Sequence, residues 1–87
     1  MNPRYRVEIE PPAWEQLMKL PVKMQERIDS AIEALESDPR PSGVKKLKSE
    51  RDLYRVRVGD YRIIYEIQDA VLVVLIVKVG KRGDVYR

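Results

Sequence analysis

Two runs of alternating apolar and polar residues, joined by Gly59 and Asp60, predict a β-hairpin in the middle of the chain. Side chains alternate between the two faces of a strand, so a turn at this pair fixes which residues share a face. The apolar face would carry Tyr54, Val56, Val58, Tyr61, Ile63 and Tyr65. The opposite face would carry Arg55, Arg57 and Arg62, with Arg57 directly across from Arg62.

The residues before this hairpin predict a strand and two helices. Residues 4–10 alternate in polarity as a half-buried strand does, and Pro11-Pro12 ends the pattern. Apolar residues at helical spacing follow, namely Ala13, Trp14, Leu17 and Met18 before Pro21, then Met24, Ile28, Ala31, Ile32 and Leu35. We expect both apolar stripes to face the core, because the helices must cover the sheet.

Two more strands complete the predicted fold. A short strand is expected over 44–48, and a longer one over 70–77 is apolar on both faces, which places it in the middle of a sheet. The element order β-α-α-β-β-β predicts an α+β fold, with an N-terminal strand, an α-helical hairpin and an antiparallel β-meander. At 87 residues, we expect a single domain over residues 1–87.

The composition excludes several kinds of chemistry. The chain has no cysteine and no histidine, which removes thiol nucleophiles, thiolate metal sites and histidine acid–base catalysis. We expect no metal site and no cofactor. There is no apolar run long enough to span a bilayer and no signal peptide, so a cytoplasmic protein without a membrane partner is expected.

Positive charge is concentrated in two segments. The net charge is +3, but residues 45–62 hold seven Lys/Arg against three acids, and residues 78–87 hold four against one. Like charges directly opposite each other destabilise a sheet, so Arg57 and Arg62 on one face suggest a bound anion, and phosphate suits a guanidinium fork. A basic outer face that is merely solvated is the alternative, and the charge pattern alone does not choose between them.

Two motifs carry a resemblance to a known family. Residues 53–65 read Leu-Tyr-Arg-Val-Arg-Val-Gly-Asp-Tyr-Arg-Ile-Ile-Tyr, and residues 79–86 read Val-Gly-Lys-Arg-Gly-Asp-Val-Tyr. Together they resemble the RelE/ParE superfamily of prokaryotic toxins, over nearly the whole chain. The resemblance implies the toxin of a type II toxin–antitoxin system, with a RelB-like antitoxin as its partner.

The resemblance implies two different activities on one fold. RelE toxins cleave messenger RNA in the ribosomal A site without a metal. The 2′-hydroxyl attacks the neighbouring phosphate and leaves a cyclic phosphate and a free 5′-hydroxyl. We expect this endoribonuclease activity, with the ribosome and mRNA as partners. ParE-type inhibition of DNA gyrase, or an inactive antitoxin-binding module, are the alternatives.

The resemblance also assigns site residues. Arg62 matches the arginine of the family's Gly-Tyr-Arg strand, and Arg82 that of its Gly-Lys-Arg turn. Tyr86 matches the C-terminal tyrosine near the cleaved phosphate, where it could transfer a proton, stack on a base or only anchor the chain end. Arg55 and Arg57 stand where RelE toxins have two lysines. Arginine stays charged, so both can stabilise a phosphate but cannot accept the hydroxyl proton.

Five lysines are expected to contact the RNA backbone, namely Lys45, Lys46, Lys48, Lys78 and Lys81. For the first three, a solvated surface is the alternative.

Tyr61 and Tyr65 fall on the apolar face of the hairpin, and we expect both to be structural.

Overall fold

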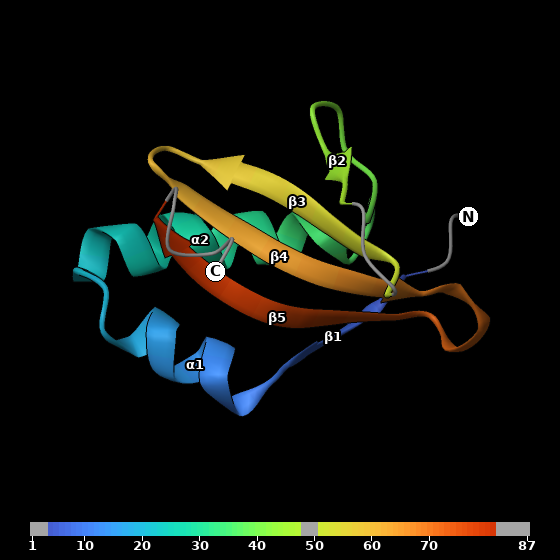
Figure 1. Ribbon diagram of the computed structural model, residues 1–87, viewed down its shortest axis with the longest axis horizontal. Coiled ribbons are helices and arrows are strands. Elements are labelled where there is room, and N and C mark those ends of the chain that lie inside the picture. The colour runs from blue at the N-terminus through green and yellow to red at the C-terminus, as the bar shows by residue number, and fades with distance from the viewer. Residues whose placement is uncertain (1–3, 48–50, 82–87) are drawn as a thin grey trace.

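The computed structural model describes residues 4–47 and 51–81. Its elements are β1 (Arg6–Ile9), α1 (Pro11–Met18), α2 (Val22–Leu35), β2 (Lys45–Lys46), β3 (Leu53–Val58), β4 (Tyr61–Gln68), the 3-10 turn η1 (Asp69–Val71) and β5 (Val73–Lys81). The predicted α+β order is confirmed. Figure 1 shows α2 behind the sheet and α1 next to β5. No helix in these ranges is both long and apolar enough to cross a membrane.

The strands form one five-stranded sheet in the order β1-β5-β4-β3-β2. β1 runs parallel to β5, and the other neighbours are antiparallel. The first and last strands in the sequence therefore lie side by side (Figure 1). This pairing was not predicted, because a half-buried alternating strand does not specify its partner.

The predicted hairpin register is confirmed. Val58 pairs with Tyr61, and Arg57 with Arg62, so the turn residues are Gly59 and Asp60. Gly59 has φ +60°, the positive value at the first central residue that a type II′ turn requires. Its backbone conformation explains why glycine begins this turn.

The core lies between the helices and the inner face of the sheet. Its fully buried side chains include Leu17, Ile28, Leu35, Ile63, Tyr65, Val74 and Ile76. The Tyr65 hydroxyl donates a hydrogen bond of 2.8 Å to the Pro39 carbonyl, and burial raises the pKa of Tyr65 above its usual value. Tyr61 packs against the same core. The structural role predicted for both tyrosines is confirmed.

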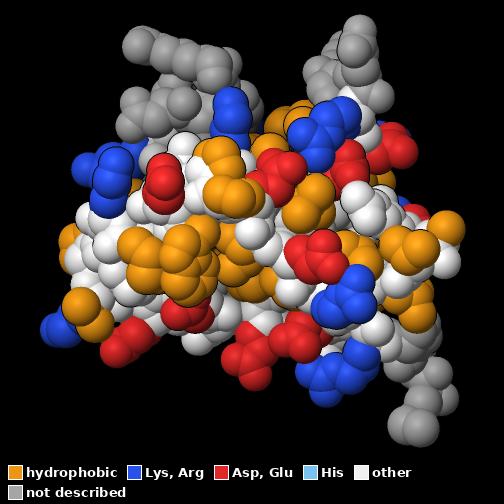
Figure 2. Space-filling model, turned by 90° about the horizontal axis from the view of Figure 1, so that it is seen from below, with side chains coloured by type: hydrophobic (Ala, Val, Ile, Leu, Met, Phe, Trp, Pro, Cys, Tyr) orange, Lys and Arg blue, Asp and Glu red, His pale blue; other side chains and the backbone are white. Residues whose placement is uncertain are grey.

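The expectation that the whole apolar stripe of α1 faces the core was wrong. Ala13 and Leu17 are buried, but the side chains of Trp14 and Met18 are 51% and 43% exposed. A helix of eight residues offers only a narrow contact with β5, and the Ala13–Leu17 ridge fills it. With Val22, which is also exposed, these residues leave apolar surface on this side of the molecule, where Figure 2 shows hydrophobic side chains gathered between charged ones.

Two predicted strand boundaries also need correction. The strand expected over 70–77 begins at Val73, because η1 and Leu72, with φ +55°, are used to reverse the chain after β4. It continues to Lys81 and does lie inside the sheet, between β1 and β4. The strand expected over 44–48 is limited to Lys45–Lys46 within the described residues.

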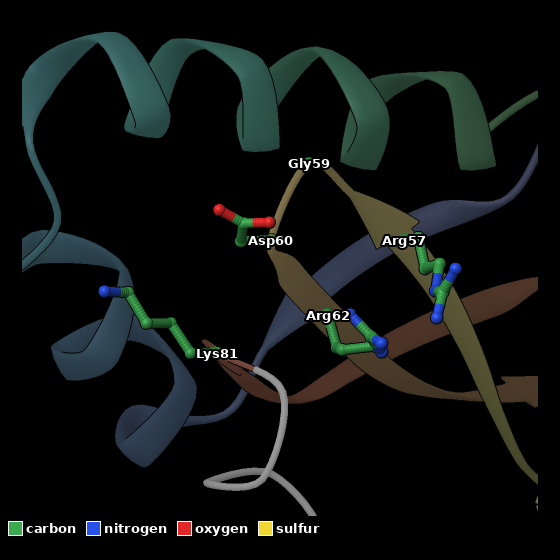
Figure 3. Close-up of a pocket in the computed structure, with 5 residues that line it drawn as sticks. All are labelled: Arg57, Gly59, Asp60, Arg62 and Lys81. Atoms are coloured by element: carbon green, nitrogen blue, oxygen red, sulfur yellow. The ribbon is translucent and has the colours of Figure 1, made fainter.

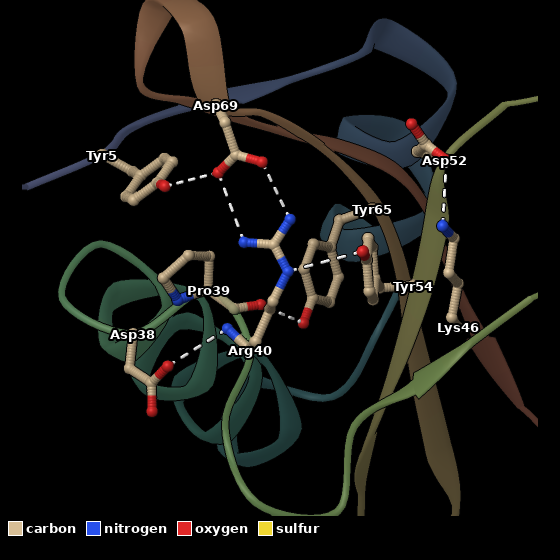
Figure 4. Close-up of polar contacts among 9 residues, drawn as sticks. All are labelled: Tyr5, Asp38, Pro39, Arg40, Lys46, Asp52, Tyr54, Tyr65 and Asp69. Atoms are coloured by element: carbon tan, nitrogen blue, oxygen red, sulfur yellow. Dashed lines mark hydrogen bonds and ion pairs between the residues drawn. The ribbon is translucent and has the colours of Figure 1, made fainter.

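A polar cluster at the end of the sheet near η1 joins three segments of the chain (Figure 4). The Arg40 guanidinium donates to both carboxylate oxygens of Asp69, at 3.3 and 2.9 Å, and lies 5.2 Å from the ring centroid of Tyr54. The Tyr5 hydroxyl donates to Asp69 at 2.6 Å. The cluster ties the loop after α2 to the start of β1 and to η1.

This cluster makes a prediction about acid stability. Hydrogen bonds from Arg40 and Tyr5 lower the pKa of Asp69 to about 2. The stabilisation from a lowered pKa is complete above the unfolded value of about 4 and is lost as the pH falls towards 2. We expect urea unfolding to show that the wild-type chain loses stability between pH 4 and 2 more steeply than Asp69→Asn. Parallel curves for the two proteins would contradict the prediction.

Candidate functional site

A basic pocket of about 470 Å³ opens at the tip of the β3–β4 hairpin. The described residues that line it are Arg57, Gly59, Asp60, Arg62 and Lys81 (Figure 3). Three of these five residues are cationic, and they come from β3, β4 and the end of β5. Sites for small ligands commonly have volumes of about 300–1,000 Å³, so the pocket is large enough to bind part of a nucleotide.

The hairpin register brings Arg57 and Arg62 together. They are opposite each other in adjacent antiparallel strands, so their side chains leave the sheet on the same face, away from the helices. Figure 3 shows the two guanidinium groups on one side of the hairpin. The sequence predicted this pair on a basic outer face, and the structure confirms its placement.

The burial of Arg62 was not predicted. Arg62 is only 3% exposed, whereas Arg57, its partner on the next strand, is exposed. A charge that is shielded from water acts more strongly on a nearby anion than a solvated one. A phosphate between these two arginines would lie next to two positive charges and receive two forked sets of donors.

Asp60 and Lys81 form the other part of the pocket lining. In Figure 3 the Asp60 carboxylate and the Lys81 amine point away from the two guanidinium groups. Lys81 lies over the Tyr61 ring, with Nζ 5.9 Å from its centroid. The predicted Lys81 is thus in the site, and Asp60, which the sequence analysis treated only as a turn residue, is at its rim.

A second row of cations lies next to the pocket. Arg55 pairs with Lys45 on β2 and with Ile64 on β4, and Ile64 pairs with Lys78 on β5. Cross-strand partners share a face, so Arg55, Lys45 and Lys78 lie on the same outer face as Arg57. None of these three is among the residues that line the pocket. Arg55 therefore lies beside the pocket, two residues before Arg57 on β3, and does not line it.

The structure places Lys46 elsewhere. It pairs with Tyr54, whose side chain is on the inner face, and its amine forms an ion pair of 3.2 Å with Asp52. The amine also lies 5.9 Å from the Tyr54 ring centroid. Its predicted contact with RNA is not supported by this position. Lys48, Arg82 and Tyr86 lie outside the described residues, so their roles stay predictions.

Sequence reasoning missed one cation beside the pocket. Arg27 of α2 reaches the hairpin turn, where its guanidinium packs against Gly59. Its position on the charged face of a helix gave no signal of this contact. Among the residues that the structure describes, no group of three or more Asp, Glu, His or Cys side chains could hold a metal ion.

The chain is similar to known toxins along almost its full length. Residues 7–86 match a family described as the ParE toxin of the type II toxin–antitoxin system. A protein of Methanocaldococcus jannaschii named as toxin RelE1 is 29% identical over 87 residues, covering 97% of each chain.

Solved structures agree with this match. A chain of the RelE–RelB complex of Pyrococcus horikoshii is similar with a TM-score of 0.81 and 36% identity, over 92% of this chain and 97% of that one. The toxin–antitoxin complex RelBE2 of Mycobacterium tuberculosis contains a chain with a TM-score of 0.79 and 30% identity, over 91% and 99%.

Proposed function

The chain belongs to the ParE toxin family of type II toxin–antitoxin systems, and we propose that it is a RelE-like endoribonuclease that cleaves mRNA in the ribosomal A site. One observation carries the proposal, namely the buried Arg62 opposite the exposed Arg57 in an open basic pocket. An anion-binding pair of this kind suits a reaction in which negative charge develops on a phosphate. Such a toxin would act in the cytoplasm, where ribosomes are.

In the proposed reaction, the 2′-oxygen of one nucleotide attacks the adjacent phosphorus. The new O2′–P bond forms as the P–O5′ bond breaks, which gives a 2′,3′-cyclic phosphate and a 5′-hydroxyl. Arg57 and Arg62 stabilise the additional negative charge on the phosphoryl oxygens in the transition state. Lys81 adds positive charge at the pocket, and Arg55 contributes from the neighbouring row.

Proton transfer needs another group. The 2′-hydroxyl loses a proton and the departing 5′-oxygen gains one, and an arginine can accept neither proton because it stays charged. Tyr86, by its match to the family tyrosine, is the proposed proton-transfer or base-stacking group. Arg82 is the proposed third phosphate-binding arginine.

The test is a cleavage assay on programmed ribosomes, run beside a gyrase supercoiling assay. We expect mRNA cleavage with 5′-hydroxyl ends and no loss of supercoiling activity. Cleavage should survive EDTA once ribosome integrity is controlled for, because the proposed reaction uses no metal. Intact mRNA together with inhibited gyrase would overturn the proposal.

Inhibition of DNA gyrase is the second candidate. Three observations favour it. The family match is to ParE toxins, and the exposed apolar side chains of Trp14 and Met18 could contact a protein. The lysines of RelE toxins are also absent from this chain, where Arg55 and Arg57 stand in their place. The supercoiling arm of the same experiment decides between the two functions.

The proposed partner is a RelB-like antitoxin, since the similar structures include RelE–RelB complexes. If the antitoxin neutralises the basic face, its affinity should fall as salt rises, because exposed charge pairs are screened. We expect Arg55→Ala/Arg57→Ala to weaken binding at low salt and to flatten the salt dependence. A titration at low and high salt measures both effects. If the affinity depends neither on the salt concentration nor on the double substitution, the antitoxin must inhibit by steric blocking and not by charge neutralisation.

A further inference from the structure

Arg27 of α2 lies on the turn that forms one wall of the basic pocket. Its Nη1 and Nη2 atoms are 3.2 and 3.3 Å from the position that a Cβ atom on Gly59 would occupy. The guanidinium thus covers the Cα of the glycine directly. Figure 3 shows α2 passing close to the hairpin tip at Gly59. Arg27 is not itself among the residues that line the pocket, but the helix brings its charge to the turn between the two strands that carry Arg57 and Arg62.

The charge of Arg27 is not compensated by nearby acids. The residue is exposed and forms no ion pair with any residue that the structure describes. Its neighbours on the helix surface, three and four positions away, are Lys23, Met24, Ser30 and Ala31, none of them acidic. Asp60, the acid of the same turn, does not approach it to salt-bridge distance.

Packing alone does not account for an arginine at this position. Covering the turn at Gly59 requires only a flat or flexible apolar group, which would avoid repulsion with Arg57, Arg62 and Lys81. A bound polyanion reverses the sign of that interaction, because each added cation then contributes to binding. The arrangement is favourable when the RNA backbone occupies the pocket and extends past the hairpin tip.

We propose that Arg27 is a phosphate-binding residue, which extends the site over the hairpin turn to the RNA backbone next to the reacting phosphate. The inference rests on the proposed nuclease function. Its substrate contact would be with a phosphate that is not cleaved, so Arg27 contributes to binding of the strand and not to the chemical step.

The experiment measures binding of the full chain to a fluorescent 2′-O-methyl RNA, which has no free 2′-hydroxyl and cannot be cleaved. The affinity is measured by anisotropy over a range of salt concentrations. We expect Arg27→Gln to reduce the slope of log K against log salt by about 0.7, the value for one phosphate contact on a single strand. Arg27→Lys should restore most of the slope, because the charge is kept.

Arg6→Gln is the matched control, since Arg6 is an exposed arginine on β1 that pairs with Glu8 at 2.8 Å. It should bind with the wild-type slope. A wild-type slope in Arg27→Gln would overturn this inference alone. Equal losses in the Lys and Gln variants would also overturn it, because they indicate a packing role for the guanidinium. A wild-type chain without salt-dependent RNA binding would overturn this inference, whereas the proposed function is overturned only by the cleavage assay on programmed ribosomes.

Discussion

Arg62→Ala is expected to reduce mRNA cleavage by roughly 30- to 1,000-fold and to abolish growth arrest on expression. The loss corresponds to about 2–4 kcal/mol of transition-state stabilisation, which is typical when one preorganised donor is removed from a site of developing charge. Arg62 is expected to have a large effect because it is 3% exposed, and a desolvated charge acts more strongly on a bound phosphate than a solvated one. Single-turnover cleavage on programmed ribosomes measures the effect.

The burial of Arg62 requires a control for folding, because alanine there leaves a cavity. Arg57→Ala supplies it, since Arg57 is exposed and lies directly across the hairpin. This variant should also lose cleavage, but its free energy of unfolding should stay unchanged or rise, because it removes a like-charge pair. Full cleavage and full toxicity in both variants at equal expression would contradict the assignment.

An inactive Arg57→Ala that is also more stable than the wild-type chain would have a further meaning. It would show that the hairpin keeps two opposed cations at the expense of stability, which a solvated basic surface has no reason to do. The two interpretations of the charge pattern that the sequence leaves open would then be separated by one unfolding curve. Arg82→Ala is also expected to abolish growth arrest, because Arg82 matches the arginine of the family's Gly-Lys-Arg turn.

The sequence predicts the hairpin well because local rules determine it. Alternation fixes the faces, Gly59 fixes the turn, and together they leave one register, in which Arg57 faces Arg62. The basic half of the site could therefore be located without a structure. Its assignment to a phosphate came from the charge repulsion, and its relation to RNA came from the family resemblance.

The features that sequence could not predict depend on contacts between distant segments. The alternation of apolar and polar residues places Arg62 on the outer face of the sheet. It does not predict how much of that face is buried by other parts of the chain. The guanidinium of Arg27 reaches Gly59 only because α2 crosses close to the hairpin tip. Likewise, the apolar run over 70–77 does not show that the chain must first turn back at Leu72 before β5 can begin.

Helix α1 offers a direct test of the difference between a helical pattern and real burial. Leu17 and Trp14 belong to the same predicted stripe, but Leu17 is 1% exposed and Trp14 51%. We expect Leu17→Ala to lower the free energy of unfolding by about 2–5 kcal/mol, because it removes buried methyl groups and leaves a cavity. For a chain of this length that is a large part of a total stability of roughly 4–13 kcal/mol.

Trp14→Ala is the matched variant on the same helix. Although tryptophan is the larger side chain, its substitution should cost no more than about 1 kcal/mol, since half of it is already in contact with water. Urea unfolding of both variants measures the difference. If Trp14→Ala nevertheless weakens antitoxin binding or gyrase inhibition while Leu17→Ala acts only through stability, the exposed side of α1 is a protein-binding surface. Equal losses of stability would instead mean that the whole stripe is buried in solution.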